Sequence, residues 1–138
     1  MEMKWNWGTC LSNKSAKKIS ADDELASSLR KTSEKKFCSS NRFALDDDSA
    51  SSIVSLAYDS VRELLEAISL ENGYKIYNHV CYTAFLKEIL NKSELAEEFD
   101  ELRIIRNDIN YYGKDVSVNE AKGILLRLGQ IRKELLKL

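Results

Sequence analysis

One short segment of the chain carries guanidinium groups, amides and a phenol at spacings that would let them act together. Arg103, Arg106, Asn107, Asn110 and Tyr111 follow one another at intervals of one and three residues, and on a helix side chains three or four positions apart are neighbours. The guanidinium group is a planar fork of donors that fits phosphate oxygens. An asparagine amide can bond a base edge, and a tyrosine ring can stack on a base. The segment therefore predicts a site for the phosphate of a nucleotide or of RNA.

The apolar residues around this segment predict the helix that would position the site. They recur at intervals of three and four residues, which draws one stripe along a helix: Leu95, Phe99, Leu102, Ile105, Ile109 and Tyr112. Gly113 follows the stripe, and glycine readily takes the left-handed conformation that ends many helices. On spacing alone, the simpler interpretation is an amphipathic helix with a solvated charged face and with Tyr112 packed inward.

A family resemblance favours the functional interpretation. Arg106-Asn107-x-x-x-Tyr111 resembles the signature of the HEPN helical domains, in which an arginine and a polar residue precede a histidine by about one helical turn. Residues 55–79 resemble the second helix of that family and the loop to its third, and the likeness extends from about residue 21 to residue 138. The chain departs from the signature at Tyr111, which stands where the family has histidine.

The resemblance implies a catalytic pair, Arg106 and Tyr111, in a composite site at the interface of a homodimer. In ribonucleases of that family, the arginine stabilises charge on the phosphate and the histidine moves protons around the attacking 2′-hydroxyl, without a metal. A phenol has a pKa of about 10, against about 6.5 for imidazole, so Tyr111 is poorly suited to that proton transfer. Some family toxins have a nucleotidyltransferase antitoxin that modifies a tyrosine just beyond the motif histidine. Tyr111 and Tyr112 lie close to that position.

Three functions are thus open. The first is a dimeric, HEPN-like protein of toxin–antitoxin or defence type that binds a nucleotide or RNA phosphate with impaired catalysis. The second is a metal-independent endoribonuclease with a composite site at the dimer interface. The third is a structural or partner-binding bundle in which the polar cluster around Arg106 only holds helices together.

The composition narrows the class of protein. The 138 residues are 43% hydrophobic and 31% charged, with no proline and five glycines, which favours one globular domain built of helices. The net charge of −1 argues against a broad nucleic-acid surface but allows a local one. The chain lacks the glycine-rich phosphate loop, the dinucleotide fingerprint, the serine-nucleophile elbow and the calcium loop, so we expect no cofactor.

The cysteines and the lack of long apolar runs bear on the cellular location, and the single histidine bears on metal binding. Cys10, Cys38 and Cys81 are odd in number and widely spaced, so we expect reduced thiols and neither a disulfide nor a zinc site. His79 is the only histidine, which excludes a metal site made of histidines from one chain, and we expect it to be exposed or locally bonded. No apolar run reaches the roughly 20 residues that span a bilayer, and no signal peptide is recognisable. These features predict a cytoplasmic protein that does not enter a membrane.

Five amphipathic stretches with short connections predict an all-α, compact antiparallel bundle of HEPN-like type over residues 21–138. Their approximate bounds are 22–43, 49–70, 78–90, 94–112 and 117–138. In the first stretch we expect Leu25, Leu29, Phe37 and Ala44 to face inward. Wide apolar faces on the second and fourth stretches predict a homodimer.

Residues 1–20 form an arm that precedes this bundle. Trp5 and Trp7 favour an arm packed on the bundle, since buried aromatic side chains anchor such segments. The alternative is a basic, aromatic arm that contacts nucleic acid through Lys14, Lys17 and Lys18.

Overall fold

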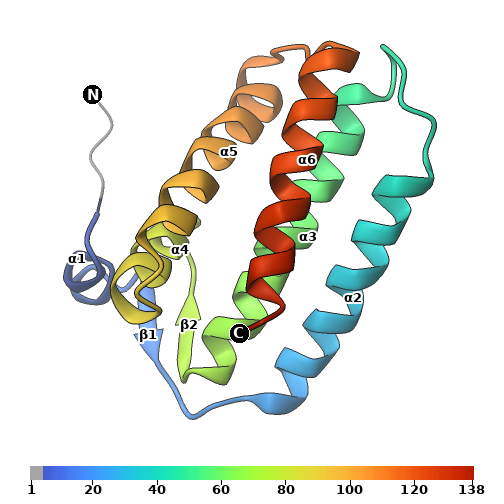
Figure 1. The fold of residues 1–138 in the computed structure, drawn as a ribbon. Helices are drawn as coiled ribbons and strands as arrows, with labels where there is room; N and C mark the ends of the chain where they lie inside the picture. Colours follow the sequence, from blue (N-terminus) through green and yellow to red (C-terminus); the bar gives the residue numbers. More distant parts are fainter. Residues whose placement is uncertain (1–4) are drawn as a thin grey trace.

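The computed structural model describes residues 5–138, and within them it confirms the all-α bundle (Figure 1). Four long helices form the body of the molecule, and a short helix, a two-stranded ribbon and a helical segment with a π-helical turn complete it. The bounds in chain order are α1 Trp7–Ser12, β1 Ala16–Lys18, α2 Asp23–Arg42, α3 Ala50–Glu71, β2 Tyr74–Ile76, α4 Val80–Ala84, η1 Phe85–Ile89, α5 Ser93–Tyr112 and α6 Val118–Leu135.

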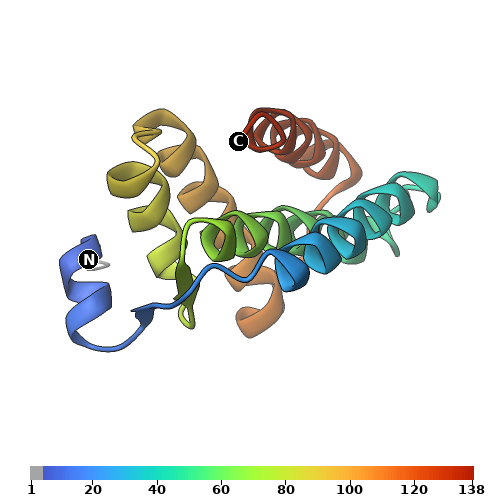
Figure 2. The ribbon, with the colours of Figure 1, turned by 90° about the horizontal axis from the view of Figure 1, so that it is seen from below.

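Helix α3 is the centre of the bundle. It lies between α2 and α5, and α6 packs alongside it (Figures 1 and 2). Most of its residues are buried, because their apolar side chains cover more than one face of the helix. Its Tyr58 stacks on Phe99 of α5 with 5.5 Å between the ring centroids. This contact fixes α5, which carries the predicted site, against the central helix.

Small polar residues hold α2 against α3. Ser33 Oγ donates to the backbone oxygen of Ser60 at 2.7 Å, and Ser60 Oγ donates to the backbone oxygen of Ser33 at 2.9 Å. Both serines are fully buried, and their small side chains let the two helices approach closely. The buried residues of α2 are Ala26, Ser33 and Ser40. The prediction that Leu25 and Ala44 face inward was wrong, because Leu25 is 41% exposed and Ala44 lies beyond the end of α2 and is exposed.

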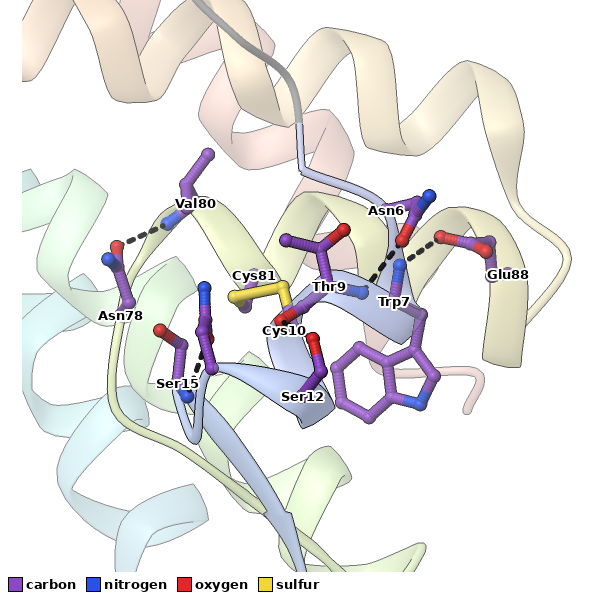
Figure 3. The surroundings of a disulfide bond; sticks show 11 residues. Asn6, Trp7, Thr9, Cys10, Ser12, Ser15, Asn78, Val80, Cys81 and Glu88 are labelled. Atoms are coloured by element: carbon purple, nitrogen blue, oxygen red, sulfur yellow. Dashed lines mark hydrogen bonds between the residues drawn. A yellow bond between two sulfur atoms is a disulfide. The ribbon is translucent and has the colours of Figure 1, made fainter.

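The amino-terminal segment is part of the packed structure. Trp7 is buried, with its ring 5.2 Å from that of Tyr74 and 5.7 Å from that of Phe85, which confirms the packing expected for this tryptophan. Its backbone N–H donates to Glu88 Oε2 at 2.6 Å (Figure 3). Strand β1 then pairs antiparallel with β2. The sequence patterns did not predict these two strands.

A disulfide joins Cys10 of α1 to Cys81 of α4, with the two Cα atoms 6.0 Å apart (Figure 3). The expectation of three reduced thiols was therefore wrong, and among residues 5–138 only Cys38 is a free cysteine. Both bonded cysteines are fully buried. Because reduced thiols were one of the grounds for a cytoplasmic location, that ground is removed. Among residues 5–138, no helix combines the length and the apolar character needed to cross a membrane.

Candidate functional site

Helix α5 presents the arginines of the predicted site from one face. Asp100, Arg103, Arg106 and Asn110 are spaced by three or four residues, which brings their side chains together. Arg103 is buried and donates from Nε to Asp100 Oδ1 at 3.0 Å. The Asn110 amide oxygen, in the orientation that satisfies both groups, accepts from Arg106 Nε at 2.9 Å. Gly113 ends the helix with a φ of 62°, in the left-handed conformation expected from the sequence.

Helix α3 supplies a second set of groups opposite these arginines. Arg106 Nη2 donates to Asp59 Oδ1 at 3.1 Å, and its guanidinium carbon lies 5.4 Å from the centre of the Tyr58 ring. One turn further along α3, Arg62 Nη1 donates to Glu66 Oε2 at 3.3 Å. Asp59, Arg62 and Glu66 follow the spacing of three and four residues that places them on one side of α3.

Helix α4 closes the site and brings in the histidine. Thr83 Oγ1 donates to Asp100 Oδ1 at 3.0 Å, which ties α4 to α5. His79, Tyr82 and Thr83 are three or four positions apart and share a face, and the rings of His79 and Tyr82 lie 6.1 Å apart. His79 is half-buried, and it is close enough to Arg62, Arg103 and Arg106 for their charges to act on it. We call Arg62, Arg103, Arg106 and His79 the arginine cluster.

The charges of the arginine cluster act on the neighbouring titratable groups. Burial lowers the pKa of His79, and the positive charges of Arg62, Arg106 and Arg103 lower it further, while Asp59 raises it. Burial raises the pKa of Tyr58 despite the same three guanidinium groups, so its hydroxyl keeps its proton. Within the described residues, that buried hydroxyl has no hydrogen-bond partner. Burial is the largest cause of the pKa shift of both groups.

The structure places the other predicted residues outside the cluster. Tyr111 and Tyr112 are 74% and 81% exposed at the end of α5, so the inward packing predicted for Tyr112 was wrong, because the apolar stripe ends before it. Asn107 is half-buried. Tyr111 follows Arg106 by five positions, a spacing that turns the two side chains to different sides of a helix. The pair Arg106 and Tyr111 named by the signature is therefore not brought together within the chain.

The structure also shows which members of the site the sequence interpretation missed. The site has further members from α3, from α4 and from the residue before α4: Tyr58, Asp59, Arg62, His79 and Tyr82. The sequence patterns gave them no place in the site, because partners of Arg106 were expected on its own helix, and His79 was expected to be exposed or locally bonded. The available signal was the recurrence of Asp59, Arg62 and Glu66 along one side of α3. His79 had no signal of its own, since its position depends on how α4 folds back on α5.

Comparison with known proteins does not identify the chain. No family model, no curated protein and no solved structure matches it. Nothing in these comparisons identifies a HEPN domain, so the resemblance stays an expectation carried by Arg106, Asn107 and Tyr111.

Proposed function

We propose that the arginine cluster binds the phosphate of a nucleotide or of RNA. The observation that carries this proposal is the gathering of Arg62, Arg103 and Arg106, from α3 and α5, around Tyr58, with the guanidinium carbon of Arg106 5.4 Å from the centre of its ring. The guanidinium groups would supply charge-assisted hydrogen bonds to the phosphate oxygens. Arg62 and Arg106 keep 20% and 18% of their side-chain surface exposed, so a ligand can reach them from solvent.

The cluster is assembled from α3, α5 and the residue that precedes α4 in one chain, so phosphate binding would need no second subunit. The composite site of a homodimer stays a separate prediction, tested by sedimentation at micromolar concentration. The nucleotidyltransferase partner likewise stays a prediction. With Tyr111 and Tyr112 exposed, a modifying enzyme would have access to both rings.

Metal-independent cleavage of RNA is the second candidate, and the position of His79 favours it. An imidazole whose pKa is lowered by burial and by neighbouring arginines is largely unprotonated at neutral pH and can accept a proton. Attack of the 2′-hydroxyl on phosphorus would form the 2′,3′-cyclic phosphate and break the bond to the 5′-oxygen. The imidazole would take the proton from the 2′-hydroxyl, and the departing 5′-oxygen would gain one from solvent.

Titration of a short RNA at low salt in the presence of EDTA tests both candidates. In Arg106→Ala we expect the affinity to fall more than tenfold, because charge-assisted hydrogen bonds contribute about 1.5–3 kcal/mol each. Arg127→Ala is the matched control, since Arg127 of α6 is also ion-paired, with Glu98 and Glu101 of α5, but is not part of the arginine cluster.

Three results separate the readings of this experiment. Equal affinity in the Arg106 and Arg127 variants would reject the arginine cluster as the phosphate site. Loss of folded structure in Arg106→Ala alone would favour a structural role for its ion pair with Asp59. Products that end in 2′,3′-cyclic phosphate would establish cleavage, and intact RNA would leave binding as the whole function.

A further inference from the structure

The two-stranded ribbon carries several lysines close together, although their mutual repulsion makes the ribbon less stable. In the register of β1 and β2, Lys17 lies directly opposite Lys75, and Lys18 lies opposite Tyr74. Like charges directly opposite each other destabilise an antiparallel pair. Lys14 adds another charge at the turn before β1, in a left-handed conformation with a φ of 64°. Within residues 5–138, these lysines form no ion pair that would compensate the repulsion.

An exposed aromatic ring lies at the end of the same ribbon. Tyr77 follows β2 and is 58% exposed, and Lys75 Nζ lies 5.5 Å from the centre of its ring. A hollow of about 540 Å³ adjoins it, and no acidic side chain lines that hollow. Its lining residues are Leu11, Lys14, Ala16, Lys17, Lys18 and Tyr77. We call Lys14, Lys17, Lys18, Lys75 and Tyr77 the basic ribbon.

Proteins bind single-stranded nucleic acid with this combination of groups. Cationic side chains follow the phosphate backbone, and an exposed aromatic ring stacks on a base of any type. Each strand of the ribbon is on the order of 10 Å long, which suits a short stretch of one strand. A duplex would hide the base faces that Tyr77 could stack on.

We propose that the basic ribbon binds single-stranded RNA, with Tyr77 stacked on a base and the lysines on flanking phosphates. Tyr77 precedes His79 by two residues, so their Cα atoms are at most about 7 Å apart. A strand held on the ribbon would therefore continue toward the arginine cluster. That continuation rests on the proposed function, whereas binding to the ribbon itself does not.

The test measures anisotropy of a labelled single-stranded oligonucleotide with the full chain at several salt concentrations. Tyr77→Ala should weaken binding by about tenfold, in the range measured for the loss of one stacked base. The double variant Lys17→Gln, Lys75→Gln should lower the slope of log affinity against log salt by about 1.4, or about 0.7 for each lost phosphate contact. We expect this double variant to fold normally, because it removes two like charges that lie opposite each other and repel.

The matched control is Lys31→Gln, Lys35→Gln, which removes the same charge from exposed positions of α2. Equal losses in the control and in the ribbon variant would overturn the proposal, since net charge alone would then explain binding. Loss of binding to vesicles of phosphatidylcholine and phosphatidylserine, with RNA binding unchanged, would assign the ribbon to a lipid surface instead. A mononucleotide separates the two sites: ribbon variants should leave its binding intact, while Arg106→Ala should impair it.

Discussion

The disulfide between Cys10 and Cys81 leads to a prediction whose size follows from the chain itself. The two cysteines are 71 positions apart in sequence. Closing a loop of that length removes conformational entropy from the unfolded chain, and the loss corresponds to about 4 kcal/mol at 25 °C. Total stabilities of single domains are about 5–15 kcal/mol. We therefore expect reduction to remove a large part of the free energy of unfolding without abolishing the fold.

Urea unfolding of the oxidised and the reduced chain measures this contribution directly. Both samples should carry Cys38→Ser, because Cys38 is the free thiol and could exchange with the disulfide. Cys10→Ala, Cys81→Ala should behave like the reduced chain. Trp7 gives a second readout, since it is buried beside Cys10, and its fluorescence should shift to the red when α1 detaches.

Two results would refute this reasoning. Oxidised protein in which Cys10 and Cys81 both react with an alkylating reagent after unfolding would show that the disulfide does not form. A difference below about 1 kcal/mol between oxidised and reduced chains would show that the unfolded chain gains little freedom on reduction. In that second case α1 would be held by the packing of Trp7 on Phe85 and Tyr74.

Two further predictions concern the arginine cluster. Because burial and neighbouring arginines lower the pKa of His79 in the folded chain, the unfolded chain binds the proton more readily, and the free energy of unfolding should fall as the pH drops below about 6.5. His79→Gln should lose less stability between pH 8 and pH 5 in urea melts, and parallel profiles would contradict the lowered pKa. Asp59→Asn removes the carboxylate that competes for Arg106, so affinity for a phosphodiester should rise several-fold; unchanged or weaker affinity in a folded variant would place the ligand elsewhere.

The helices were predictable because their patterns are long and local. Apolar residues at intervals of three and four residues marked α3, α5 and α6, and a capping box of Ser117 and Glu120 opens α6. No side chain caps the start of α5 at Lys92. Asn91 takes a left-handed conformation with a φ of 56°, because the chain reverses there between η1 and α5.

The ribbon and the disulfide were not predictable by the same means. Strands of three residues are too short for an alternating pattern to stand out, and β1 pairs with a strand far along the chain. Cys10 and Cys81 have no characteristic spacing either, since only the fold brings them together. A single sequence contains little information about contacts between distant segments, and both the β1–β2 pairing and the Cys10–Cys81 disulfide are contacts of that kind.

The candidate site shows the same division between local and distant information. The segment around Arg106 placed Arg103, Arg106 and Asn110 on one helix, where Arg103 bonds Asp100 and Arg106 bonds Asn110. It assigned proton transfer to Tyr111, whereas the second candidate function assigns it to His79, because a motif specifies spacing along one helix and not the side chains that face it. Each of Arg62, Arg103 and Arg106 also pairs with a carboxylate, so the cluster is stable without a ligand. Under the proposed function, an anion must therefore displace or share these partners, and it would do so at Arg62 and Arg106, whose side chains stay partly exposed.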